Sequence, residues 1–294
     1  MIASCKAPLG GVRFLVRSRI VALVVVTLSL SCASRSTATF VAPAKEDAGD
    51  ATSNAEHPRA PFDAVAPTPD ARGEASAAPP TNERAQALKV AGFEDAIVVI
   101  PAEMKPVPLL VAAHGAGGDP AWECERWARV ARGRWFLLCP CGAPLRRGEA
   151  GSYYYPEHHT LEREVTAAVL AAREKYGTRI TTAGGTYVAY SQGATMGALM
   201  LVEHGDEFPH LLLIEGGSGD WTRARAERFR ATGGESVFIV CGTSGCAGRA
   251  ARARPVLERA GLATEVRVIE NGGHTELEAV GAAAETLLET LAPR

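Results

Sequence analysis

A serine between small residues is the first candidate for chemistry. The segment Ala189–Ala194 reads Ala-Tyr-Ser-Gln-Gly-Ala, and it joins the apolar run Tyr187–Tyr190 to a helical pattern that begins at Thr195. A sharp strand-to-helix turn of this kind exposes the serine hydroxyl, and small neighbours let other backbone segments pack against it. Such a hydroxyl becomes a nucleophile when a neighbouring base takes its proton. We therefore predict Ser191 as a nucleophile, with a helix-capping serine as the alternative.

A glycine-rich segment could stabilise the negative charge that attack by a serine creates. Residues 114–118 read His-Gly-Ala-Gly-Gly and follow the apolar run Leu109–Ala113. Glycines let backbone N–H groups approach a developing oxyanion closely. We predict that the amides of Ala116 and Gln192 form this oxyanion hole. A phosphate-binding loop would need a following Lys and Ser or Thr, which this segment lacks.

A histidine after the last predicted strand supplies a candidate base. Gly272-Gly273-His274-Thr275 follows the run Val266–Ile269. An imidazole there could take the proton of Ser191 and return it to the leaving group. No Cys and His spacing in the chain is typical of a metal site, so we predict neither a metal nor a cofactor.

The order of the glycine-rich loop, the serine and the histidine, each at a strand end, resembles the α/β-hydrolase family. Ala189 stands where the G-x-S-x-G motif of that family has its first glycine. The resemblance implies a Ser-His-acid triad that hydrolyses carboxylic esters or thioesters through an acyl-enzyme. It is greatest to small carboxylesterases and thioesterases, which implies a small-molecule or polymeric ester as substrate.

The third member of the triad departs from the family pattern. The family usually places an acid after the strand that here is Val237–Val240, but Cys241–Gly248 contains none. Some relatives carry the acid one strand earlier, where this chain has Glu215. We predict Glu215 as the acid, with Asp220 as the second candidate and Glu270 as the third.

The missing acid leaves alternatives open. Thr243 or Ser244 could hydrogen-bond the imidazole without supplying a charge. The rival function is a non-catalytic or weakly active surface protein that keeps the fold for binding, because a fold does not by itself imply a function.

The elements that must position these residues alternate between strands and helices. Short apolar runs are typical of strands buried on both faces of a parallel sheet. They occur at Ile97–Ile100, Leu109–Ala113, Trp135–Leu138, Tyr187–Tyr190, Leu211–Ile214, Val237–Val240 and Val266–Ile269. Apolar residues at helical spacing lie between Leu161 and Ala172 and between Leu277 and Leu291. We predict an α/β fold with a mostly parallel central sheet flanked by helices, and a ligand site at the carboxyl ends of the strands.

The surroundings of the site are predicted to be open. Only one helical segment, Thr222–Ala231, lies between the strand that ends at Ile214 and the next strand, which leaves no room there for a large cap domain. The stretch Gly142–Thr160, with its three tyrosines, is the candidate rim of the pocket.

The N-terminal region predicts export. A basic start precedes the short apolar run Ile20–Leu30, which is typical of a signal peptide, predicted here as residues 1–31. Leu28–Cys32 resembles a bacterial lipobox, which implies acylation of Cys32 and a membrane anchor through lipid. The protein is then either a lipoprotein of the bacterial cell envelope, at the outer membrane or in the periplasm, or a secreted protein.

Two further segments follow. Residues 32–85 are rich in Ala and Pro and carry no apolar periodicity, so we predict a disordered tether, followed by a hydrolase domain at 86–294. The net charge of −2 gives no reason to expect nucleic-acid binding. Because an exported domain can form disulfides, we predict Cys241–Cys246, and Cys124 paired with Cys139 or Cys141.

Overall fold

The computed structural model describes residues 84–146, 151–182 and 184–292. The predicted signal peptide, the acylation site Cys32 and nearly all of the predicted tether lie outside the described residues. Strand β1 (Arg84–Leu88) begins two residues before the predicted start of the domain at residue 86. Arg84 and Ala85 belong to this strand because they pair with Ile100 and Val99, a tertiary contact that the local sequence pattern does not reveal.

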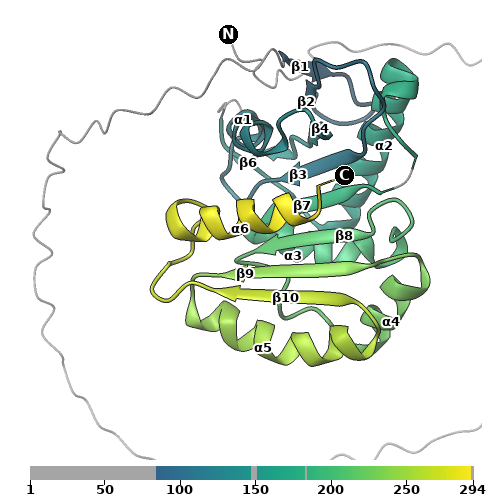
Figure 1. Ribbon diagram of the computed structural model, residues 1–294. Helices are drawn as coiled ribbons and strands as arrows, with labels where there is room; N and C mark the ends of the chain where they lie inside the picture. The colour runs from purple at the N-terminus through teal and green to yellow at the C-terminus, as the bar shows by residue number, and fades with distance from the viewer. Residues whose placement is uncertain (1–83, 147–150, 183, 293–294) are drawn as a thin grey trace, which may run out of the picture. The chain divides into compact units, whose positions relative to one another are not determined.

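The central sheet has eight strands in the order β1-β2-β4-β3-β7-β8-β9-β10. The strands other than β1 are β2 (Ala96–Ile100), β3 (Leu109–Ala113), β4 (Phe136–Cys139), β7 (Thr186–Tyr190), β8 (His210–Ile214), β9 (Ser236–Cys241) and β10 (Ala263–Val268). The β1–β2 and β2–β4 pairs are antiparallel, and every later pair is parallel. Figure 1 shows the arrows of β8, β9 and β10 pointing the same way, so the loops after them gather at one edge.

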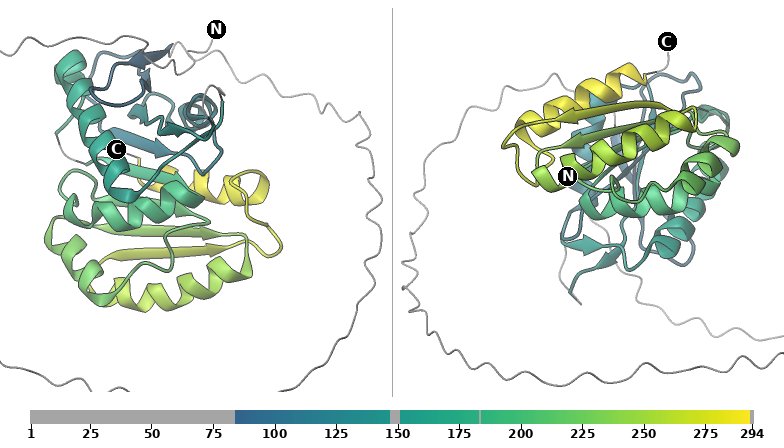
Figure 2. Two further views of the ribbon diagram at one scale, coloured as in Figure 1. Left: turned by 180° about the vertical axis from the view of Figure 1, so that it is seen from behind. Right: turned by 90° about the horizontal axis from the view of Figure 1, so that it is seen from below.

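Helices cover both faces of the sheet. The helices are α1 (Pro120–Ala131), α2 (His158–Tyr176), α3 (Ser191–Met200), α4 (Arg223–Ala231), α5 (Ser244–Arg259) and α6 (Glu278–Thr290). One apolar core lies beneath α2 to α5, and the other lies beneath α1 and α6. The view from behind in Figure 2 shows α2, α3 and α5 in front of the sheet and α6 beyond it. No helix among the described residues is long and apolar enough to cross a membrane.

The predicted mostly parallel α/β fold is confirmed, with differences at particular elements. The run Val266–Ile269 was predicted to be buried on both faces, yet β10 pairs only with β9 and is half-exposed, because it is the edge strand. Helix α3 begins at Ser191 rather than at Thr195. A small hairpin of β5 (Ala143–Pro144) and β6 (Tyr153–Tyr154) was not predicted.

Disulfides join neighbouring elements. Cys124 in α1 is bonded to Cys139 at the end of β4, which selects Cys139 from the two predicted partners. Cys241 at the end of β9 is bonded to Cys246 in the first turn of α5, as predicted.

Candidate active site

Ser191 lies at a strained turn between β7 and α3. Its φ of 49° is in the left-handed region, where a residue with a side chain is uncommon. The turn packs closely against the end of β3. A Cβ on Gly193 would lie only 2.7 Å from the carbonyl oxygens of Ala113 and His114, too close for a side chain. The small residue at 193 therefore lets the serine turn pack directly on the end of β3. This is the local geometry that the Ala-Tyr-Ser-Gln-Gly sequence predicts.

His274 lies beside the serine. Its Nε2 is 2.8 Å from Ser191 Oγ, and its Nδ1 is 3.0 Å from Oε2 of Glu215. An ionised carboxylate can only accept hydrogen bonds, so Nδ1 carries the proton and donates it to Glu215. The remaining nitrogen, Nε2, is then free to accept the proton of the serine hydroxyl. The three residues form one continuous hydrogen-bonded chain.

Glu215 is buried and held by several donors. Its side chain is only 1% exposed, whereas that of His274 is 53% exposed. Its Oε1 accepts hydrogen bonds from the amides of Gly242 and Thr243, and its Oε2 accepts one of 2.9 Å from the Thr243 hydroxyl. Burial raises the pKa of Glu215, but the hydrogen bonds from Thr243, Gly242 and His274 outweigh it, and the pKa lies below its usual value. The carboxylate is therefore charged at neutral pH.

The glycine-rich loop after β3 lies against the serine. A Cβ on Gly115 would be 3.2 Å from the Cβ of Ser191. The amide of Gly117 donates to Tyr153 and that of Gly118 donates to Gly115, whereas the exposed Ala116 has no such acceptor among the described residues.

The other predicted oxyanion donor lies in the first turn of α3. Gln192 follows Ser191 there, and the first amides of a helix have no acceptor within the helix. Gln192 thus directly follows the serine, and Ala116 directly follows Gly115, which packs on the serine. Their role as an oxyanion hole stays a prediction.

The other acid candidates do not reach the histidine. Among the described carboxylates, Glu215 alone lies within hydrogen-bond distance of His274. Burial raises the pKa of Asp220, which lies near Arg225 and Arg249 instead. The alternative in which Thr243 hydrogen-bonds the imidazole does not occur in the structure, because the Thr243 hydroxyl donates to the Glu215 carboxylate instead. Ser244 is exposed at the start of α5.

Sequence reasoning missed contacts that brace the site. The Tyr190 hydroxyl donates a 2.8 Å hydrogen bond to the carbonyl of His274, which ties the histidine loop to the serine turn. The side-chain oxygen of Gln192 accepts a 2.9 Å hydrogen bond from the amide of Tyr155. Both residues flank Ser191, which was the available signal, but their partners are distant in the sequence.

The site is open to solvent. Only the loop Glu215–Thr222 joins β8 to α4, so the described chain places no cap domain there. The stretch predicted as the rim contacts the glycine-rich loop and Gln192, but two of its three tyrosines, Tyr153 and Tyr155, are buried, and Tyr154 is half-buried. That the stretch lines the pocket stays a prediction. A cavity of about 540 Å³ near the β1–β2 turn includes no triad residue.

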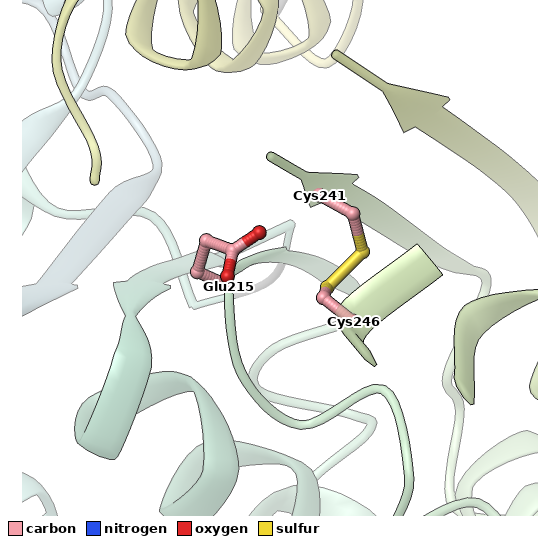
Figure 3. A group of neighbouring side chains, drawn as sticks. All are labelled: Glu215, Cys241 and Cys246. Atoms are coloured by element: carbon pink, nitrogen blue, oxygen red, sulfur yellow. A yellow bond between two sulfur atoms is a disulfide. The ribbon is translucent and has the colours of Figure 1, made fainter. Parts of the chain in front are cut away.

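A metal site does not explain the acid's surroundings. The carboxylate of Glu215 and the sulfur atoms of Cys241 and Cys246 lie within 4.8 Å of one another. Figure 3 shows that the two sulfur atoms are bonded to each other, so neither is a thiolate ligand. Glu215 is engaged by His274 and Thr243 instead.

Comparisons with known proteins support the fold. No family model and no curated protein matches the sequence. Among solved structures, TT1662 from Thermus thermophilus is 18% identical, with a TM-score of 0.55, covering 72% of this chain and 99% of that chain. Esterase PE8 is 16% identical, with a TM-score of 0.52 and coverages of 66% and 97%. An S-formylglutathione hydrolase from Agrobacterium tumefaciens is 14% identical, with a TM-score of 0.51 and coverages of 71% and 93%. The solved structures that it resembles thus include esterases and hydrolases, and the chain has the α/β-hydrolase fold.

Proposed function

We propose that the protein is a serine hydrolase that cleaves carboxylic esters or thioesters through an acyl-enzyme. The observation that carries the proposal is the continuous chain from Ser191 Oγ through His274 to Glu215. A serine held in a strained turn, next to a base that a buried carboxylate orients, has the arrangement that nucleophilic catalysis requires.

The reaction would follow from this geometry. His274 Nε2 takes the proton of Ser191 as its oxygen bonds to the carbonyl carbon, and the amides of Ala116 and Gln192 stabilise the oxyanion. The imidazolium then gives its proton to the leaving alkoxide or thiolate, and an acyl-serine remains. Water attacks this ester with the same histidine as base, which releases the acid and restores the serine.

The substrate follows from the open site. A half-exposed histidine and the short loop after β8 support small or soluble acyl esters, or the accessible end of a polymer, as substrates.

We further propose that the mature chain is exported and anchored to a membrane through acylated Cys32. Fractionation of cells that carry the wild type or Cys32→Ala would test this. Loss of the variant from the membrane fraction is expected.

Hydrolysis of p-nitrophenyl acetate, butyrate and octanoate by the wild type and by Ser191→Ala tests the function. Loss of turnover to the background rate in the variant is expected, because the nucleophile is absent. Ser236→Ala is the matched control, because Ser236 is a serine at the start of β9, at the other end of the strand from the triad, where its hydroxyl contacts His210. Equal rates in all three proteins would reject ester catalysis and favour a non-catalytic binding protein.

A further inference from the structure

The loop after β9 lacks the acid that the fold usually carries there. It nevertheless contacts both Glu215 and the loop that carries His274. Its first residues lie against Glu215 through N–H groups. The amides of Gly242 and Thr243 both donate to Glu215 Oε1, the latter at 2.9 Å. The Thr243 hydroxyl donates to Oε2 at 2.9 Å, the same oxygen that accepts from His274.

The carbonyl groups of Cys241 and Gly242 accept hydrogen bonds from the segment that leads to His274. The amide of Gly273 donates a 3.0 Å hydrogen bond to the carbonyl of Gly242, and the amide of Ile269 donates a 2.7 Å hydrogen bond to that of Cys241. Gly242 therefore contacts Glu215 through its N–H and the residue before His274 through its C=O. One short segment sets the separation of the acid and the base.

The Thr243 hydroxyl is fixed from both sides. It accepts a 3.3 Å hydrogen bond from the amide of Cys246 as the N-cap of α5, so its proton points away, toward Glu215. Cys246 is in turn bonded to Cys241, and this disulfide closes the loop Cys241–Cys246 beside Glu215 (Figure 3). The disulfide thus limits the conformations of the segment that carries all three donors.

We propose that the disulfide-closed loop Cys241–Cys246 positions Glu215 and His274, with Thr243 as a positioning residue. The loop supplies hydrogen-bond donors where the fold usually supplies the carboxylate, and the carboxylate comes from the neighbouring strand. This inference rests on the proposed function, since it concerns the acid of the same triad.

The test compares Thr243→Val, Thr243→Ser and the double variant Cys241→Ala/Cys246→Ala with the wild type. We expect kcat to fall by about 10- to 100-fold in Thr243→Val, because the variant loses one hydrogen bond to a charged group. KM stays near the wild-type value, because the contact does not touch the substrate. Thr243→Ser keeps the donor and the cap, and therefore most of the activity.

The pH profile separates positioning from a general structural role. Loss of a donor to the carboxylate raises the pKa of Glu215, so the acidic limb that reflects protonation of Glu215 moves to higher pH in the kcat/KM profile of Thr243→Val. We expect the acidic limb of the double cysteine variant to move to higher pH as well. A profile with an unchanged acidic limb in both variants would overturn the proposal.

Matched controls exist in this chain. Thr222 caps α4 through a 3.3 Å hydrogen bond from Arg225, without contact to the triad among the described residues, so Thr222→Val should alter thermal unfolding only. The Cys124–Cys139 disulfide lies between α1 and β4, so Cys124→Ala/Cys139→Ala should lower the unfolding temperature and leave the pH profile in place. Equal kinetic losses in these controls would refute a specific role for the loop.

A carbon-13 titration of the Glu215 carboxyl group gives a readout that does not depend on activity. A higher pKa in Thr243→Val than in the wild type supports the loop's role even if the wild type hydrolyses no ester, in which case only the proposed function fails. Ser191-dependent hydrolysis with an unchanged titration and unchanged kcat would reject the positioning role alone.

Discussion

At the scale of single residues, the site depends on two backbone conformations that the chain tolerates at some cost. Ser191 and Glu215 have φ values of 49° and 52°, and they directly follow the adjacent parallel strands β7 and β8. Each such conformation costs on the order of 1–3 kcal/mol and persists where its surroundings hold it in place. Here the packing of Gly193 beneath the serine and the donors around Glu215 hold both side chains toward His274.

Replacing the acid by its amide tests the role of its charge. Glu215→Gln keeps the side-chain shape but presents a neutral group to His274. A neutral amide no longer favours the Nδ1–H tautomer or the imidazolium of His274. We expect kcat to fall by about 10⁴-fold, the loss that follows when a triad acid is disabled in this way. Steady-state kinetics with p-nitrophenyl butyrate would measure it.

The matched control for this substitution is Asp220→Asn, at the second acid candidate. Asp220 lies near Arg225 and Arg249 and makes no described contact with His274. Its variant should keep the wild-type kcat. A strong loss in Asp220→Asn with a weak one in Glu215→Gln would reverse the assignment of the acid.

At the scale of elements, helix α1 is tied to the segment between His274 and α6. Arg126 of α1 donates a 2.7 Å hydrogen bond to Glu276, and both side chains are almost fully buried. Burial raises the pKa of Glu276, the nearby carboxylate of Glu123 adds to the rise, and Arg126 opposes it. Arg126 also lies 3.9 Å from the carboxylate of Glu285 and is the cation of this cluster.

Removing that cation should destabilise the fold. Arg126→Met keeps the apolar volume of the side chain but leaves Glu276 without its buried partner. Breaking a buried pair from one side costs about 3–5 kcal/mol, which we expect as a lower free energy of unfolding in urea.

The exposed ion pair Arg223–Glu227 provides the comparison for Arg126→Met. Arg223→Met should lower the free energy of unfolding far less than Arg126→Met does, because both groups of the Arg223–Glu227 pair are solvated. Similar losses in the two variants would contradict the structural role of the buried pair.

At the scale of the whole molecule, a buried acid links stability to pH. Glu164 of α2 is 2% exposed and accepts hydrogen bonds of 2.9 and 2.8 Å from the amides of Cys141 and Gly142, so it fastens α2 to the segment after β4. Burial raises the pKa of Glu164 to about 7, although these two hydrogen bonds lower it. The folded state therefore holds a proton that the unfolded chain releases at lower pH.

The sign of the effect follows from this linkage. A carboxyl group with a raised pKa in the folded state contributes stability that is complete below pH 4.5 and is lost as pH rises to about 7. At about 1.4 kcal/mol per pKa unit, the loss is on the order of 3 kcal/mol. Glu164→Gln keeps the acceptor without the titration, so its stability should stay flatter over this range in urea denaturation.

Glu174→Gln, an exposed position on the same helix, should follow the wild-type curve. Parallel curves for the wild type and Glu164→Gln would show that Glu164 does not carry the linkage.

The sequence by itself determined the parts of this protein that depend on local patterns. Continuous apolar runs located the strands of the parallel sheet, because burial on both faces demands them. Ser191 and His274 were found because each lies among small residues at a strand end, where turn geometry is a local property. The pair Cys241–Cys246 followed from short spacing alone.

The tertiary structure decided what depends on strands that meet across the sheet. Glu215 directly follows β8, Thr243 lies in the loop after β9, and their contact follows from the pairing of these two strands. Burial of Tyr153 and Tyr155 follows from their packing on the glycine-rich loop. Sequence order could name the candidate acids, but the choice of Glu215 over Asp220 required the distance to His274, since a hydrogen bond acts only over about 3 Å.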